Sequence, residues 1–204
     1  MEPLFSASSG RERLSAVLRR TSDLVTVDDA SAAHYWDLTE QIFRAAFVHT
    51  ARPARQTQQV IQEVPFSVHH LRSELLFGTR AVWRRRLKIE LSDIHRTVID
   101  MLDKPGAGGG IRHLAECLGA HVRRDDADRK RLIDHAERIG NGAIFKRLGF
   151  LTERAGAAPE LVAACAARLT QGNAKLDAAR ASPRLVRRWR LWVPERWMSG
   201  AAPR

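Results

Sequence analysis

The sequence predicts an α+β fold: a short N-terminal helical remnant, a small mixed β-sheet, then a layer of four to five helices and a late returning strand. Three observations support this prediction. Short runs that alternate apolar and polar residues fill much of residues 43–91, as in strands with one solvent-facing side. Apolar residues at helical spacing dominate residues 92–169. A last alternating run, at residues 185–193, predicts a strand that returns to the sheet.

The first part of the chain predicts two helices around one extended piece. Residues 11–20 carry leucine and valine at helical spacing, residues 24–27 alternate, and residues 30–38 follow two aspartates that suit a helix N-cap. A small winged helix–turn–helix domain often begins in this way, but the recognition helix and the wing that should follow are not found in the sequence. Residues 1–33 are therefore expected to be a partial winged-helix-like segment, and residues 34–204 the main domain.

The sheet is expected from five short runs. In the last of them, leucine and isoleucine alternate with Lys88 and Glu90, which is typical of a strand with one wet face. Three consecutive arginines, at residues 84–86, lie where the last two runs meet, and a hairpin is expected there. The predicted strands span residues 43–49, 59–62, 66–71, 81–85 and 87–91.

A helix that begins near Asp93 is followed by four further helical patterns, at residues 111–121, 127–139, 141–154 and 159–169. Gly149 lies in the middle of the third of these patterns. Glycine costs about 1 kcal/mol there relative to alanine, which predicts close approach by another backbone on that side. The charged edge of the same helix, formed by Lys146, Arg147 and Arg154, is expected to be solvated.

The chain of 204 residues carries a formal net charge of +11, which favours an anionic partner, either nucleic acid or an acidic protein. Basic residues between 123 and 131 are interleaved with aspartates, so their field is expected to be largely cancelled. Two other basic clusters lack acidic neighbours and lie on predicted strands. The candidate nucleic-acid-binding residues are therefore Arg84, Arg85, Arg86, Arg187, Arg188 and Arg190.

Trp189 lies within the second of these clusters and leaves two interpretations open. Together with Trp192 and Trp197 it can stack on bases while the arginines neutralise phosphates. Alternatively, Trp189 belongs to the core and the arginines point to water. The sequence alone does not separate the two interpretations.

Patterns that indicate catalysis or metal binding are not found in the sequence. His69 and His70 are adjacent on a predicted strand and would face opposite ways, and no HExxH motif is present. Cys117 and Cys165 fall in helical apolar patterns, which predicts buried thiols isolated from any base. The tripeptide at 128–130 has the Asp-x-Lys order of some magnesium-dependent nucleases, but it lies in a helical charge run. We expect no catalytic residues, no metal and no cofactor.

A membrane protein is not expected, because no apolar run approaches the length needed to span a bilayer. The first ten residues lack the apolar core of a signal peptide. The expected localisation is therefore cytoplasmic.

Six ordered stretches give the chain a resemblance to the AbiEi family of antitoxins, the transcriptional-regulator half of type IV toxin–antitoxin (abortive infection) operons. We refer to them as the signature stretches. They are HYWDLTEQIF (residues 34–43), FGTRAVWR (77–84), LSDIHRTVIDMLDKP (91–105), GGGIRHLAECL (108–118), NGAIFKRLGFLTER (141–154) and RWRLWVPERW (188–197).

The resemblance implies a binding protein without an activity of its own. Members of this family typically carry an N-terminal winged helix that represses their own operon. Their C-terminal domain counteracts a cognate nucleotidyltransferase-like toxin, usually without a stable complex. By this resemblance residues 34–204 correspond to the antitoxin domain, and residues 14–33 to the opening of a truncated winged helix. The implied partners are the toxin and operator DNA.

Two other functions stay open at this point. The first is a DNA-binding transcriptional repressor that acts through the basic surface patches, which would show a steep salt dependence. The second is a metal-dependent nuclease of unrecognised type, which would require three or more carboxylates that converge in one pocket.

Overall fold

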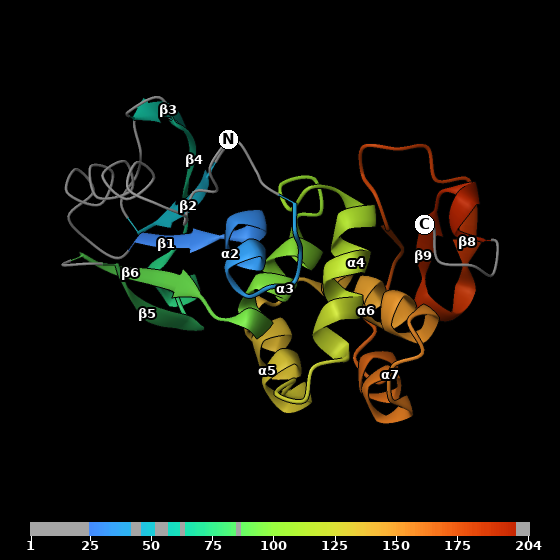
Figure 1. The fold of residues 1–204 in the computed structure, drawn as a ribbon. Coiled ribbons are helices and arrows are strands. Elements are labelled where there is room, and N and C mark those ends of the chain that lie inside the picture. Colours follow the sequence, from blue (N-terminus) through green and yellow to red (C-terminus); the bar gives the residue numbers. More distant parts are fainter. Residues whose placement is uncertain (1–24, 42–45, 52–56, 62–63, 85–86, 199–204) are drawn as a thin grey trace. The chain divides into compact units, whose positions relative to one another are not determined.

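In the computed structural model the described residues are 25–41, 46–51, 57–61, 64–84 and 87–198, and they confirm the α+β class (Figure 1). The predicted helix at 11–20 lies outside the described residues. Contacts divide the chain into two compact units, Met1–Thr97 and Val98–Arg204. This division differs from the boundary at residue 33 that the sequence suggested.

The first unit contains a six-stranded mixed sheet with the strand order β3-β4-β2-β1-β6-β5. Two pairs of neighbours are parallel, β1 with β6 and β2 with β4, and the other pairs are antiparallel. The register brings apolar residues together, since Val48 lies opposite Val68 and both are buried. The strands are β1 Val25–Asp28, β2 Ala46–Thr50, β3 Gln58–Ile61, β4 Val64–His70, β5 Thr79–Arg84 and β6 Leu87–Ser92.

A short helix, α2 (Asp29–Tyr35), follows β1 directly and packs against β2. Ala32 and Ala33 on this helix are fully buried, and their small side chains allow it to lie close to the sheet. The helix ends before residue 38, where the sequence suggested its end. A single 3-10 turn, η1 (Ser73–Leu75), connects β4 to β5.

The second unit is mainly helical, and residues 144–152 of its helix α6 are all buried. The helix ends follow local signals in the sequence. Asn141 caps α6 by accepting a hydrogen bond from the Ala143 amide at 3.0 Å, and Gly140 ends α5 in the left-handed conformation. The helices are α3 Ile94–Asp103, which crosses the division between the units, α4 Ile111–Val122, α5 Arg129–Ile139, α6 Gly142–Arg154 and α7 Pro159–Ala166.

The prediction of one late strand that returns to the sheet was wrong in two respects. Residues 185–193 form two short strands joined by a 3-10 turn, because Arg190 adopts a left-handed conformation (φ 50°) that interrupts the alternation. These strands also pair with a third short strand in a separate sheet of order β7-β9-β8. The elements are β7 Ala174–Lys175, β8 Arg184–Val186, η2 Arg187–Trp189 and β9 Leu191–Val193, followed by the 3-10 turn η3 Glu195–Trp197.

Candidate functional site

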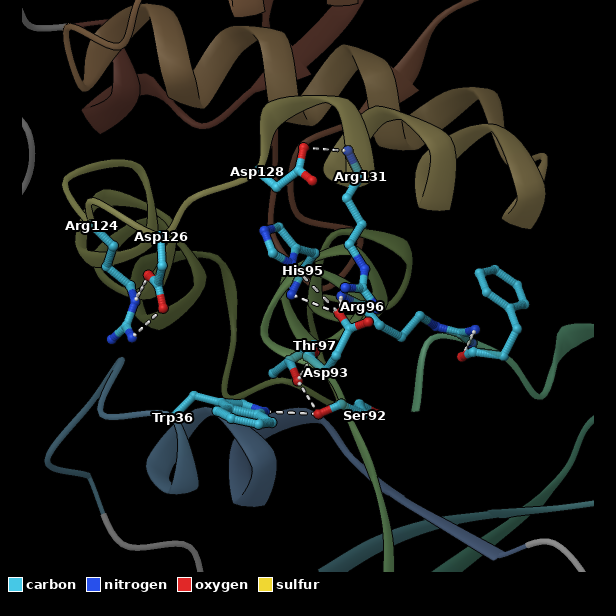
Figure 2. Close-up of polar contacts among 11 residues, drawn as sticks. Trp36, Ser92, Asp93, His95, Arg96, Thr97, Arg124, Asp126, Asp128 and Arg131 are labelled. Atoms are coloured by element: carbon cyan, nitrogen blue, oxygen red, sulfur yellow. Dashed lines mark hydrogen bonds and ion pairs between the residues drawn. The ribbon is translucent and has the colours of Figure 1, made fainter. Parts of the chain in front are cut away.

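Three signature stretches meet in the first unit, in a group of residues that we call the sheet cluster: Trp36, Phe77, Ser92, Asp93 and Arg96. Asp93 starts α3, since its Oδ1 accepts the amides of His95 at 3.0 Å and Arg96 at 2.9 Å (Figure 2). The Asp93 amide in turn donates to the carbonyl oxygen of Gly78 at 2.8 Å. This aspartate therefore fixes both the beginning of the helix and the entry of the chain into it.

Arg96 is almost completely buried in the sheet cluster. Its Nη1 donates to the carbonyl oxygens of Leu75 at 2.9 Å and Phe77 at 3.0 Å, and its guanidinium lies 4.3 Å from the centre of the Phe77 ring. Trp36 Nε1 donates to the carbonyl oxygen of Ser92 at 2.7 Å (Figure 2). The polar groups of these signature residues are thus used to hold the unit together.

A second group, the helix cluster, lies in the second unit and contains Arg147, Gly149, Glu153, Arg188 and Trp189. Arg147 joins three segments through their carbonyl oxygens. Its Nη1 donates to Leu102 at 2.7 Å and Asp103 at 3.1 Å, and its Nε donates to Lys175 at 3.0 Å.

The solvated edge that periodicity suggested for α6 was therefore wrong for two of its residues. Burial lowers the pKa of Arg147, while Asp103 and Asp177 oppose that effect. Lys146 is also buried, and its Nζ donates to the carbonyl oxygen of Gly172 at 2.9 Å. Backbone carbonyls from distant segments solvate these charges in place of water.

The close approach expected at Gly149 is made by a side chain and not by another backbone. A Cβ at this position would overlap the Cε3, Cζ3 and Cη2 atoms of the Trp189 indole ring. Trp189 is fully buried, and its Nε1 donates to Glu153 Oε2 at 2.6 Å. Of the two interpretations of Trp189, membership of the core is therefore the correct one, and base stacking on this ring is excluded.

One arginine of the basic cluster at Arg187, Arg188 and Arg190 is compensated by an acid, which the sequence did not suggest. Arg188 Nη1 forms an ion pair of 2.6 Å with Glu153 on α6, and Arg190 Nη1 donates to the carbonyl oxygen of Thr170 at 3.0 Å. Arg187 is exposed and has no ion-pair or hydrogen-bond partner among residues 25–198 that the structure describes. Among the described residues, Arg187 and Arg190 are thus exposed and have no ion pair with an acid, and Arg187 is the one without a hydrogen-bond partner.

The other basic cluster is only partly covered by the structure. Strands β5 and β6 pair antiparallel with Arg84 opposite Leu87, which confirms the expected hairpin arrangement of the two strands. Arg85 and Arg86 lie outside the described residues. Trp83 on β5 has a side chain that is 64% exposed, and the sequence analysis did not point out this exposure. The alternation of side chains along a strand was the signal that could have indicated it.

The charges near α5 are paired locally, as expected. Arg124 makes two hydrogen bonds to Asp126, at 2.7 and 3.0 Å, and Lys130 pairs with Asp134 at 2.6 Å (Figure 2 for the first pair). Asp128, the acid of the nuclease-like tripeptide, caps α5 by accepting the Arg131 amide at 2.9 Å. Its position is explained by helix capping.

Cys117 lies next to a base, which the sequence did not suggest. Its Sγ is 3.4 Å from His113 Nε2, one helical turn earlier on α4. Burial raises the pKa of Cys117 to about 12 and lowers the pKa of His113, so both groups are neutral near pH 7. Burial also raises the pKa of Cys165 to about 12. Neither thiol is therefore activated as a nucleophile.

Within the part of the chain that the structure describes, no group of three or more histidine, cysteine, aspartate or glutamate residues could hold a metal ion. None of the described helices combines the length and the apolar character that crossing a membrane requires. A comparison with protein-family models finds none that matches this chain, and a comparison with curated proteins likewise finds no match.

Proposed function

We propose that this protein is the antitoxin component of a type IV toxin–antitoxin (abortive infection) module and counteracts a nucleotidyltransferase-like toxin. The proposal rests on the resemblance of the six signature stretches to that family. In the fold these stretches, which are far apart in sequence, supply the residues of the sheet cluster and of the helix cluster.

In the proposed role the protein binds and performs no reaction of its own, and it requires no cofactor. The resemblance suggests that it counteracts the toxin without a lasting complex, inside the cytoplasm. Operator DNA is the second proposed partner, through which the protein would regulate its own operon. The net charge of +11 supports contact with nucleic acid in general.

Co-expression tests the proposal directly. The nucleotidyltransferase encoded beside this protein is induced alone and together with the full chain, and we expect the full chain to restore growth. Persistent growth arrest while the chain accumulates as folded protein would contradict the proposal, as would the absence of such an enzyme from the neighbouring reading frames.

A pair of charge variants then tests whether the exposed basic surface contributes to the rescue of growth. Arg187→Ala removes an exposed arginine that has no described partner. Arg112→Ala is the matched control, since Arg112 is exposed, lies in the same unit and pairs with Glu116 on its own helix. Weaker rescue by the first variant alone would assign the contribution to η2, whereas equal rescue would exclude it.

A further inference from the structure

The three-stranded sheet of the second unit (β8 and β9 in Figure 1) leaves one tryptophan on its outer side. Its central strand β9 alternates, since Leu191 and Val193 are fully buried and Trp192 between them is only partly buried. The two other tryptophans of this segment, Trp189 and Trp197, belong to the core. The fold therefore encloses two of three neighbouring indole rings and leaves part of the third in water.

A row of side chains crosses the sheet at Trp192. The register places Lys175 of β7 on one side of it and Leu185 of β8 on the other. Partners in register share a face of a sheet, so these two side chains flank the indole ring. Lys175 is exposed and lies on an outer strand, and Leu185 is partly buried. The row thus offers a flat apolar surface with a positive charge at one edge.

A second cation lies at the same edge of the sheet. Arg190 directly precedes β9, and its carbonyl oxygen accepts the amide of Ala174 on β7 at 3.0 Å. Its Nη1 donates to the carbonyl oxygen of Thr170 at 3.0 Å, and the side chain is exposed. A guanidinium has five N–H donors, so Arg190 keeps donors that no described residue uses.

The turn that leads into β7 gathers two positive charges. Lys146 Nζ of α6 donates to the carbonyl oxygen of Gly172 at 2.9 Å, two residues after Thr170, to which Arg190 donates. The pKa of Lys146 is lowered by burial and then by the charge of Arg190, and no described carboxylate opposes these effects. Two like charges without an acid beside them would stabilise an anion bound at this turn.

The acids of the surrounding segment are already engaged. Glu195 pairs with Arg184 at 2.7 Å, and the buried Asp177 pairs with Arg180 at 3.5 Å. The side chain of Lys175, by contrast, has no ion pair and no hydrogen bond among residues 98–198 of the structure. Positive charge therefore dominates the β7 edge of this sheet.

We propose that the outer face of the three-stranded sheet binds single-stranded nucleic acid, with Trp192 stacking on one base and Lys175 and Arg190 neutralising phosphates. A single strand is favoured over a duplex, because the faces of bases are covered by their neighbours in a double helix. An acidic protein segment could neutralise the cations, but it offers no base to the ring. This site is independent of the proposed antitoxin role and differs from contact with duplex operator DNA.

Fluorescence anisotropy with the full chain tests this proposal. The probes are fluorescein-labelled oligonucleotides of about 12 nucleotides, in the range of known single-strand site sizes, as RNA, as DNA and as a DNA duplex. We expect either or both of the single strands to bind more tightly than the duplex, and polyglutamate to compete less well than an unlabelled single strand. Saturating unlabelled oligonucleotide should also quench part of the tryptophan fluorescence, because a base contacts the Trp192 ring.

Variants separate stacking from charge. Trp192→Ala should weaken binding about 5- to 150-fold without a change in the salt slope. Trp192→Phe should keep most of the affinity and lose the quenching. Lys175→Ala should instead reduce the magnitude of the slope of log K against log salt by about 0.7 unit, the value for one phosphate contact of a single strand.

Each kind of variant has a matched control. Trp83→Ala removes an exposed tryptophan of the first unit, and Lys130→Ala removes an exposed lysine of α5 that pairs with Asp134. Neither control should change the affinity or the salt slope. Urea midpoints and circular dichroism are measured for every variant, because Trp192 is partly buried and its loss lowers stability.

Four results would overturn the proposal. The first is equal affinity of folded Trp192→Ala and the unaltered chain, and the second is equal or tighter binding of the duplex. The third is an equal loss of affinity in Trp83→Ala. The fourth is equal competition by polyglutamate, which would assign the surface to an acidic protein. Where Trp192→Ala does not fold, undiminished quenching in Trp192→Phe or an unaltered salt slope in Lys175→Ala would each contradict the proposed site.

Discussion

Replacement of Gly149 by alanine tests the packing of the helix cluster. On an open helix surface this change stabilises a protein by about 1 kcal/mol, because alanine has the higher helix propensity. At Gly149 the added Cβ overlaps three carbon atoms of the buried Trp189 ring, and that ring is held by its hydrogen bond to Glu153. The ring must therefore move.

The expected magnitude follows from these contacts. Overpacking of a core costs about 1–3 kcal/mol. Displacement of Trp189 also weakens a hydrogen bond to a charged acceptor, which typically contributes about 1.5–3 kcal/mol. These losses outweigh the gain in propensity, and we expect Gly149→Ala to lower the free energy of unfolding by about 2–4 kcal/mol.

Urea denaturation followed by far-ultraviolet circular dichroism measures this change. Gly119→Ala is the matched control, because Gly119 also lies inside a helix, α4, but its added Cβ meets only the end of the flexible Arg123 side chain, at 3.3 Å. We expect the control to be neutral or stabilised. A double-mutant cycle with Trp189→Phe should show coupling of at least about 1 kcal/mol. Higher stability of Gly149→Ala, or additive energies in the cycle, would refute the reasoning.

Three further outcomes are expected. Arg147→Lys keeps the charge but loses the planar donor set that joins three carbonyl oxygens, so the urea midpoint should fall by an amount equivalent to about 2–4 kcal/mol, and an unchanged midpoint would contradict the role of that set. The pKa of His113 is lowered by burial, so the unfolded chain binds more protons below its ordinary pKa of about 6.5. Stability should therefore fall as the pH drops below about 6.5, and His113→Gln should reduce this dependence when urea midpoints are compared. Because burial raises the pKa of Cys117 and Cys165 to about 12, both thiols should resist Ellman's reagent at pH 8 in the folded chain and react in urea, and rapid reaction of the folded chain would show the burial to be wrong.

Features set by local sequence were predictable. The caps at Asn141 and Asp93 and the end of α5 at Gly140 depend on residues within one helical turn, and the structure has helices that begin or end there. The antiparallel pairing of β5 with β6 was also predictable. Two strands that follow each other closely in the sequence usually form a hairpin.

Features that depend on distant partners were not predictable. Gly149 indicated close packing, but its partner Trp189 lies in another signature stretch, and no local rule identifies it. The compensation of Arg188 by Glu153 has the same cause. The order of the strands in the sheet was likewise not predictable from local patterns. The position of β5 at one end of the sheet, and with it the exposure of Trp83, was therefore missed.

The burial of the signature residues has a consequence for variants of this chain. Arg96 and Arg147 donate hydrogen bonds to backbone carbonyl oxygens, and Trp189 is fully buried. A change at any of these positions should first reduce the quantity of intact protein in the cell, whatever it recognises. Two proteins can therefore share these stretches and still bind different partners. The exposed residues, and not the buried ones, would determine which partner each protein binds.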